Sequence, residues 1–473
     1  MSLVIDAVMS AAKRTPNRIS ISYSGGALTC ENLAREVDAL AELLSRQAGP
    51  IGIALDNGPA WIVSDLAVLA TGRVCVPLPP FFTAAQQAAA LADAGASRLI
   101  APGQQRVICG QGLEVRETGF SARVLHGGTS KITYTSGSTG QPKGVCLSRS
   151  QIEAVATSLV QVLGVERAGA HLAVLPLGVL LENVAGLYPI LLAGGRYHAA
   201  TLAEVGQGQA FRPDPMQLLA AIRATSATSL ILVPELLRGL IAAKQMSGLA
   251  TPTLNLVAVG GARVSPTLLS AAAAAGLPVV EGYGMSECAS VLAMNRPGHA
   301  VPGTVGEPLP HVRLEIAPDG EVIVSAPAFL GYVGVPATAG LLHTGDIGAL
   351  DAAGRLRIEG RKDNLIITGF GRNVSPEWVE SELTSEPQIL QAMVFGEAQS
   401  SLGALIAAMP GAAPDQLAAA VARANGRLPD YAKITRWRQT PLFDPAAGQL
   451  TANGRPRRAV LAQAYADFVL EPA

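Results

Sequence analysis

The sequence contains few charged and few aromatic residues. Only 15% of its 473 residues are Asp, Glu, Lys or Arg, and only 4% are Phe, Trp or Tyr. The 35 basic and 36 acidic residues leave a formal net charge of −1, so no global positive field exists to hold nucleic acid or an anionic membrane. A hydrophobic content of 49% excludes a disordered chain. We therefore expect a globular protein with a core of small aliphatic side chains and no nucleic-acid partner.

Cysteine is scarce, and the cysteines form no recognisable pattern. They lie far apart and include no C-x-x-C pair: Cys30, Cys75, Cys109, Cys146 and Cys288. This spacing is typical of neither a disulfide framework nor a zinc site, and it favours a reducing compartment. The first residues have no basic segment before an apolar stretch, so they are unlike a secretion signal. We expect a cytoplasmic protein.

The sequence also lacks a long uninterrupted apolar run. Its most apolar stretch, residues 172–195, is broken by Pro176, Glu182, Asn183 and Pro189. A membrane-spanning helix needs about 20 consecutive apolar residues. We therefore expect a buried core segment here and no transmembrane segment.

What the chain does contain is a regular alternation of helix and strand signals. An amphipathic pattern covers residues 31–47, and short β-rich runs follow at 51–55, 74–78 and 97–100. The alternation continues through runs at 171–177, 229–234, 255–260 and 277–284, the first three being mainly apolar and suited to strands buried on both faces. This pattern predicts βαβ units on parallel sheets, and the fold class is α/β.

The pattern changes in the last third of the chain, where it indicates further structural units. After Gly303, short alternating strands and turns predict a small β subdomain over about 303–362. Ser375 followed by Pro376 is a strong helix start within a second α+β region. We predict a large N-terminal domain over 1–362 and a small C-terminal domain over 363–473.

The segment with the clearest chemistry is the stretch 132–145, a β-rich run that leads into hydroxyls and glycines and then resumes as a strand. Glycines let backbone N–H groups converge on an anion, hydroxyls add short donors, and Lys143 adds a positive charge. The stretch predicts a loop that wraps phosphates with these residues: Thr135, Ser136, Gly137, Ser138, Thr139, Gly140 and Lys143. It is not a Walker A loop, which requires G-x-x-x-x-G-K-[ST] before a helix, so a plain ATPase is disfavoured.

At these residues the sequence resembles the adenylate-forming superfamily, which includes acyl-CoA synthetases, luciferases and the adenylation domains of peptide synthetases. The motif T-S-G-S-T-G-x-P-K-G is unbroken, and further motifs follow in the family's order from about Ala27 to Arg458. The pattern around Pro176 and Glu182 is most similar to fatty acyl-CoA ligases. The resemblance implies a large α/β domain followed by a small mobile domain, with a hinge at Asp363.

The resemblance also implies roles for residues in the later motifs. The segment 281–287 resembles Y-G-x-T-E, with Ser in place of Thr. It implies that Tyr283 lies on adenine, that Ser286 bonds a phosphate and that Glu287 helps to hold Mg²⁺. The segment 344–346 resembles the T-G-D motif, which implies that Asp346 binds the ribose hydroxyls. The segment 360–363 resembles the G-R-x-D motif, which implies that Arg361 contacts the nucleotide. Gly261 and Gly284 complete the expected nucleotide site.

Two departures from the family pattern bear on activity and substrate. Arg455 stands where the family has a lysine that bridges the carboxylate and the α-phosphate, and a planar guanidinium differs in reach from an ammonium. The alternative is that the surrounding basic cluster is a solvated tail. The expected acyl pocket is apolar and contains no basic residue: Gly178, Val179, Leu180, Gly260 and Ala262. The alternative is that these residues simply pack the core.

The resemblance and the residues together predict an enzyme that activates a hydrophobic carboxylic acid, of the fatty acid kind, with ATP and Mg²⁺. Lys143, Glu287 and Arg455 are the candidate catalytic residues: Lys143 and Arg455 can offset phosphate charge directly, and Glu287 can do so through the Mg²⁺ that it would hold. The acyl-adenylate would then pass to a thiol, for which CoA is the first candidate. Two alternatives remain: transfer to a carrier-protein phosphopantetheine, and a degenerate, non-catalytic nucleotide-binding protein.

Overall fold

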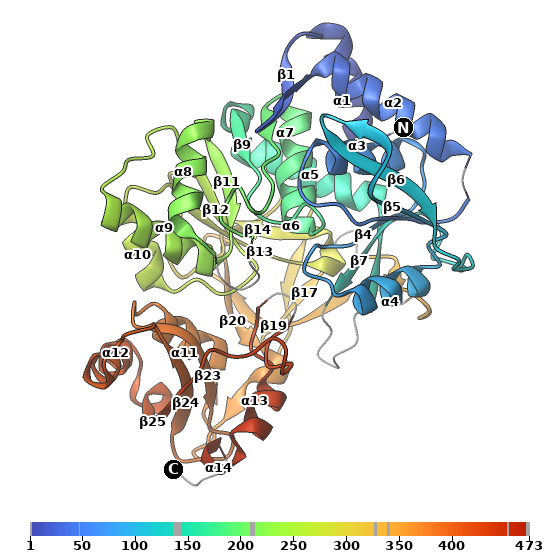
Figure 1. Ribbon diagram of the computed structural model, residues 1–473. Helices are drawn as coiled ribbons and strands as arrows, with labels where there is room; N and C mark the ends of the chain where they lie inside the picture. Colours follow the sequence, from blue (N-terminus) through green and yellow to red (C-terminus); the bar gives the residue numbers. More distant parts are fainter. Residues whose placement is uncertain are drawn as a thin grey trace.

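The computed structural model describes residues 2–46, 48–135, 143–208, 213–325, 329–337, 341–451 and 454–469. In this part of the chain, two large sheets form the body of the N-terminal region, and smaller sheets follow toward the C-terminus (Figure 1).

The first large sheet has the strand order β15-β14-β13-β12-β11-β9-β10-β1-β2. The strands from β13 to β1 run parallel, and β14, β15 and β2 join antiparallel at the two edges. The apolar run at 229–234 forms β11, whose residues are all buried, as expected for a parallel strand covered on both faces. The strands are β1 Ile19–Tyr23, β2 Gly26–Thr29, β9 Ala170–Leu172, β10 Arg196–His198, β11 Ser229–Leu232, β12 Leu256–Val259, β13 Val279–Met285, β14 Ser290–Met294 and β15 Glu307–Pro308.

The second large sheet has the order β18-β8-β7-β4-β3-β5-β6. Its centre is parallel, while β7 and β8 form an antiparallel hairpin. The runs at 51–55, 74–78 and 97–100 therefore lie in parallel strands, as predicted. The strands are β3 Ile51–Ile53, β4 Cys75–Pro77, β5 Arg98–Ile108, β6 Gln111–Glu117, β7 Thr129–Thr135, β8 Lys143–Ser148 and β18 Gly331–Tyr332.

Helices divide the core around these sheets into separate clusters. One cluster packs α1, α2, α3, α5 and α7 against the strands, and another packs α8, α9 and α10 against β9, β11 and β12. A π-helix, Asn183–Leu187, interrupts the segment between α6 and α7. The helices are α1 Leu3–Arg14, α2 Cys30–Ser45, α3 Pro59–Ala70, α4 Ala84–Ala94, α5 Arg149–Leu163, α6 Leu180–Glu182, α7 Tyr188–Ala193, α8 Pro215–Thr225, α9 Pro234–Ser247 and α10 Pro266–Ala274.

The C-terminal region carries smaller sheets and its own core. One sheet has the order β16-β17-β19-β20, and the hairpin signals after Gly303 fall in it: β16 Leu314–Ile316, β17 Glu321–Val324, β19 Leu342–Leu350 and β20 Leu356–Arg361. The same stretch also contributes β15 and β18 to the two large sheets.

Beyond residue 363, a sheet of β23, β24 and β25 packs with α11 and α12 around a separate core (Figure 1). The predicted helix start is present, since the Ser375 side chain accepts a hydrogen bond from Trp378 N at the beginning of α11. The elements are β21 Ile366–Ile367, β22 Asn373–Val374, α11 Pro376–Thr384, β23 Ile389–Phe395, β24 Leu402–Ala408, α12 Pro414–Gly426, β25 Ile434–Thr440, α13 Arg458–Ala464 and α14 Ala466–Val469.

The apolar stretch 172–195 is folded into α6, the π-helix and α7, and most of its residues are buried. Among the described residues, no helix is both long enough and apolar enough to cross a membrane.

Candidate active site

A single cleft of about 2700 Å³ receives the candidate residues from both regions of the chain. Its wall is formed by strand ends of both large sheets and by side chains from beyond residue 363. The candidates that line it are Thr135, Lys143, Gly178, Val179, Leu180, Gly260, Gly261, Ala262, Tyr283, Gly284, Ser286, Glu287, Asp346, Arg361 and Arg455. Ser136, Gly137, Ser138, Thr139 and Gly140 lie outside the described residues.

The expected phosphate loop connects β7 to β8 along the chain, and the structure describes its two flanking residues. Thr135 and Lys143 face each other as the last pair of this antiparallel ladder, so the strands hold the two ends of the loop side by side. The Lys143 Nζ lies 5.5 Å from the ring centroid of Tyr332, within the range of a cation–π interaction. The hairpin therefore directs a positive charge into the cleft.

Tyr332 connects this lysine to the expected metal-binding carboxylate. Its hydroxyl donates to Glu287 Oε1 at 2.8 Å, and desolvation together with the charge of Glu287 raises the pKa of Tyr332. Tyr332 is not marked by any sequence motif, because it lies in β18 and reaches the site only through the pairing of β18 with β8.

Glu287 is suited to a magnesium ion that is shared with a nucleotide. Within the described residues, no group of three or more His, Cys, Asp and Glu side chains could hold a metal ion by itself. Mg²⁺ commonly takes one or two carboxylates and completes its shell with water and substrate phosphates. A single partly exposed carboxylate next to a phosphate loop matches that donor set.

Asp346 lies at the centre of a second cluster, which fits a ribose. Tyr283 donates its hydroxyl to Asp346 Oδ2 at 2.6 Å, and Arg361 Nη1 donates to Asp346 Oδ1 at 3.1 Å. Each carboxylate oxygen still has lone-pair capacity for a further donor, so this buried group can accept bonds from two neighbouring hydroxyls. Burial and the charge of Asp346 raise the pKa of Tyr283.

Gly284 and Gly261 are required for steric reasons at the edges of this cluster. A Cβ built on Gly284 would overlap the carbonyl oxygen of Ser290 on the neighbouring strand β14. Gly261 has a φ of +83°, in the region that favours glycine. These two glycines allow the backbone of β13 and the turn after β12 to form the wall of the cleft.

An apolar channel leads away from Gly260 along strands β11 and β12. The residues of these strands and their ends that line it are Ser229, Leu230, Ile231, Val233, Leu256, Ala258, Val259 and Gly260. Leu181, Ala185, Gly186 and Pro189 form the opposite wall. The expected pocket residues Gly178, Val179 and Leu180 line the same cleft at the start of α6.

The expectation that the acyl pocket has no basic residue needs correction, because His171 and Arg167 also line this cleft. No motif marks these two residues, because they precede the Pro176 segment and reach the cleft through the position of β9 in the sheet. His171 is buried between neighbouring strands.

Arg455 reaches across from the C-terminal region to the large domain. Its Nη2 donates to the carbonyl oxygen of Gly261, while the side chain remains exposed to the solvent in the cleft. The loop that carries it is closed by a bridge between Leu450 and Pro456. The basic cluster is therefore not a solvated tail in this structure.

Arg458 fixes the base of the same loop. It pairs with Glu380 at 2.7 Å and donates to the carbonyl of Val394 at 3.0 Å. Burial raises the pKa of Glu380 to about 7, although the charge of Arg458 opposes this shift. Glu377, on the same helix, accepts from Asn364 at 2.6 Å, beside the predicted hinge.

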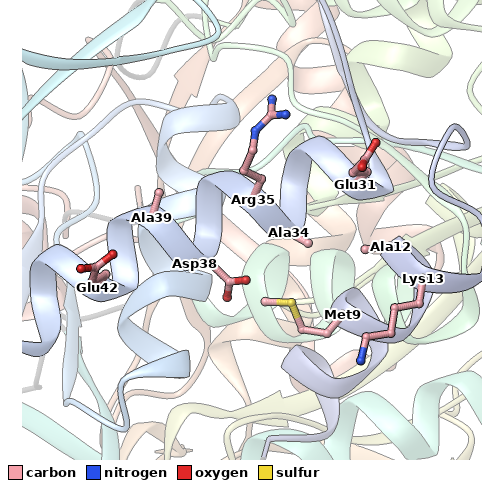
Figure 2. Close-up of a pocket in the computed structure, with 9 residues that line it drawn as sticks. All are labelled: Met9, Ala12, Lys13, Glu31, Ala34, Arg35, Asp38, Ala39 and Glu42. Carbon is pink, nitrogen blue, oxygen red and sulfur yellow. The ribbon is translucent and has the colours of Figure 1, made fainter.

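A second hollow, of about 510 Å³, lies between α1 and α2 (Figure 2). Its rim carries charged side chains such as Lys13, Glu31 and Asp38, and none of the candidate residues lies in it. The chemistry predicted from the sequence therefore belongs to the large cleft.

Comparison with known proteins gives two family matches and a set of relatives. A family model described as AMP-binding enzyme matches residues 8–326, and one described as AMP-binding enzyme C-terminal domain matches residues 363–471. A long-chain-fatty-acid–CoA ligase, FadD15, from Mycobacterium bovis is 33% identical over 44% of this chain but only 40% of its own length. A feruloyl-CoA synthase from Amycolatopsis is 29% identical over 81% of this chain and 84% of its own.

Solved structures share the fold across almost the whole chain. The anthranilate CoA ligase AuaEII, in complex with anthranoyl-AMP, superimposes with a TM-score of 0.81 at 20% identity, covering 98% of this chain and 97% of its own. The o-succinylbenzoate CoA synthetase from Bacillus subtilis, with its acyl-adenylate intermediate, gives 0.78 at 23% identity, covering 96% and 97%. The expected α/β fold, with a large N-terminal domain and a separate C-terminal domain, is confirmed.

Proposed function

This chain belongs to the AMP-binding enzyme family, and from that premise we propose that it activates a hydrophobic carboxylic acid with ATP and transfers the acyl group to the thiol of CoA. The membership confirms the resemblance to the adenylate-forming superfamily. The observation that carries the proposal is the convergence of a phosphate hairpin, a ribose cluster and an apolar channel on one cleft.

The first half-reaction forms an acyl-adenylate. An oxygen of the substrate carboxylate attacks the α-phosphorus of ATP, pyrophosphate leaves, and AMP becomes the leaving group of the activated acyl carbon. Lys143 and Arg455 offset negative charge on the phosphates and the carboxylate, while Tyr283, Asp346 and Arg361 hold the nucleoside. Positioning and charge compensation of this kind are the main contributions a protein makes to phosphoryl chemistry.

Magnesium would be held at Glu287, with Tyr332 orienting that carboxylate through its hydroxyl. Bound there, Mg²⁺ would neutralise phosphate charge and orient the leaving pyrophosphate.

The second half-reaction transfers the acyl group. A thiol attacks the acyl carbon, the thioester bond forms, and AMP leaves with the electron pair of the broken acyl–oxygen bond. The small domain beyond residue 363 carries Arg455 and would have to move away about a hinge at Asp363 before a thiol could enter. We assign the domain boundary to this position, where Asn364 is tied to Glu377.

The experiment that tests this function is acid-dependent release of pyrophosphate from ATP and Mg²⁺. The acids are saturated fatty acids, aryl acids and amino acids, each with and without CoA. We expect release with hydrophobic acids and faster turnover with CoA. Release that requires a phosphopantetheinylated carrier protein would instead identify a carrier-loading enzyme. No release with any acid, despite tight AMP binding, would identify a non-catalytic nucleotide-binding protein.

Substitution of Asp346 by Asn tests the ribose site. The amide keeps the size of the side chain but loses the charge that pairs with Arg361 and one acceptor for hydroxyls. Because hydrogen bonds to charged groups contribute about 1.5–3 kcal/mol, we expect the KM for ATP to rise by roughly 10- to 100-fold. Steady-state kinetics with ATP as the varied substrate measure this, and an unchanged KM would exclude Asp346 from the nucleotide site.

A further inference from the structure

A chain of hydrogen bonds lies beside the apolar channel at Ser229, the first residue of β11. The Ser229 hydroxyl lies 3.0 Å from His171 Nδ1, and His171 Nε2 lies 3.1 Å from Glu182 Oε1. All three side chains are buried, and Ser229 and His171 line the cleft. No step of the proposed reaction uses them.

Glu182 fixes the orientation of this chain. Its Oε1 also accepts from the Tyr197 hydroxyl at 2.7 Å, and its Oε2 accepts from Leu175 N at 3.0 Å. A carboxylate only accepts, so His171 Nε2 carries the proton, and on a neutral ring Nδ1 accepts from Ser229. Within the described residues nothing else bonds the Ser229 oxygen, so a substrate hydroxyl can donate to a remaining lone pair of this oxygen in either protonation state of the ring.

Position 186 packs closely against this chain of hydrogen bonds, which is why it is glycine. A Cβ there would lie 2.8 Å from Glu182 Oε1 and 3.3 Å from both His171 Nε2 and Ile231 Cδ1. Gly186 lines the cleft opposite Ser229 and Ile231.

The position of Ser229 along the channel predicts the length of the acid that would reach it. Gly261, whose carbonyl accepts from Arg455, lies beside Val233, since a Cβ on Gly261 would be 3.6 Å from Val233 Cγ1. A strand rises about 3.3 Å per residue, so the step from Val233 to Ser229 spans roughly 13 Å. Between these two points the β11 and β12 side chains that face the channel are apolar.

We propose that Ser229, held by His171 and Glu182, recognises a hydroxyl group near the far end of an elongated acid, so that the acid substrate is a hydroxylated long-chain acid rather than a plain one. This inference rests on the proposed function, in which the carboxylate of the substrate lies near Gly261 and Arg455. A site that bonds a substrate hydroxyl disfavours an analogue that lacks this hydroxyl. The reason is that the buried polar group of the protein then has no hydrogen-bond partner.

The test compares plain saturated acids with ω-hydroxy acids of the same lengths, from octanoic to tetradecanoic acid. The measured quantity is the ratio of kcat/KM for pyrophosphate release between hydroxylated and plain acid. For the unmodified protein we expect this ratio to reach about tenfold or more near ω-hydroxydodecanoic acid. In Ser229→Ala it should fall to about one, whereas Ile231→Val, which trims the same wall by one methyl group, should preserve it.

The outcomes separate this inference from the proposed function. A ratio near one at every length, or an equal ratio in Ser229→Ala, would overturn the role of Ser229 even if plain acids are activated. If no acid releases pyrophosphate, the same ratio is taken from dissociation constants measured by calorimetry with AMP present. Tighter binding of the hydroxylated acid that is lost in Ser229→Ala would then support the recognition site, although the proposed activity fails. Equal binding of both acids would overturn the recognition site as well as the proposed activity.

Discussion

Substitution of Arg455 by Ala is expected to lower acid-dependent pyrophosphate release by roughly 100- to 1000-fold. Arg455 is the cation that the C-terminal region delivers to the cleft wall at Gly261, where the carboxylate and the α-phosphate would meet. Loss of one preorganised donor to developing charge typically has an effect of this size. Single-turnover release of pyrophosphate measures it, because that signal reports the first half-reaction alone.

The lysine variant shows whether the site is built around a guanidinium. Arg455→Lys keeps the charge but loses the planar fork, which can bond Gly261 and still direct other donors into the cleft. We therefore expect a partial loss, of about tenfold, rather than a gain. A large gain in rate would mean that arginine impairs the site, in agreement with the degenerate alternative. Arg357→Ala, on the exposed surface of β20, is the control and should leave the rate unchanged.

Much of the architecture could be predicted because its signals are local. Apolar runs such as 229–234 and the Ser375 helix start each depend on a few adjacent residues, and both are present in the structure. The candidate residues were found by motif, and those the structure describes line one cleft although the chain separates them by up to about three hundred residues. Parallel strands bring their ends to one edge, which accounts for Gly260 and Tyr283 after β12 and in β13. Asp346, Arg361 and Arg455 reach the cleft from an antiparallel sheet and from the C-terminal loop, so their arrival does not follow from the fold class alone.

The features that could not be predicted depend on contacts between distant segments. Tyr332 reaches Glu287 only because β18 returns to pair with β8, and a two-residue strand has no periodic signal. The Ser229–His171–Glu182 chain likewise depends on the register of β9 against β11. The environment of Glu281 could not be predicted either. Burial raises the pKa of this carboxyl to about 7, and the position of Glu281 in the sequence does not reveal that burial.

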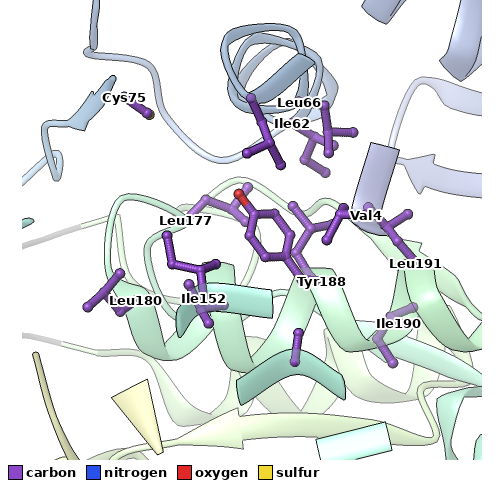
Figure 3. Close-up of a cluster of buried hydrophobic side chains, with 14 of the residues drawn as sticks. Val4, Ile62, Leu66, Cys75, Ile152, Leu177, Leu180, Tyr188, Ile190 and Leu191 are labelled. Atoms are coloured by element: carbon purple, nitrogen blue, oxygen red, sulfur yellow. The ribbon is translucent and has the colours of Figure 1, made fainter. Parts of the chain in front are cut away.

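The buried ion pair between Lys131 and Asp65 also depends on contacts between distant segments, and its loss has the largest expected effect on stability. Lys131 Nζ lies 2.8 Å from Asp65 Oδ1 and 3.1 Å from the Tyr188 hydroxyl, and it also bonds Asn183. Tyr188 in turn donates to Asp65 Oδ2 at 2.6 Å. Apolar residues that include Ile62, Leu66 and Leu177 surround Tyr188 in the core (Figure 3).

Substitution of Lys131 by Met is therefore expected to lower the free energy of unfolding by about 3–5 kcal/mol, because it leaves the Asp65 carboxylate buried without a counter-charge. The side chains of the pair are only 3% and 1% exposed, so water cannot replace the lysine. Urea unfolding followed by circular dichroism measures the loss. Lys433→Met, which breaks a pair with the exposed Asp430, is the matched control and should cost less than about 1 kcal/mol.

The double variant Lys131→Met with Asp65→Leu distinguishes a lost charge balance from a lost packing role. Removing both charges leaves Tyr188 and Asn183 to pair with each other, so most of the stability should return. The ion pair joins β7 to α3, and the bond from Lys131 to Asn183 joins β7, one strand of the phosphate hairpin, to the π-helix beside the acyl channel. If stability returns while pyrophosphate release stays low, the pair also aligns these two halves of the cleft. If the double variant is as unstable as Lys131→Met, the uncompensated charge of Asp65 is not the cause.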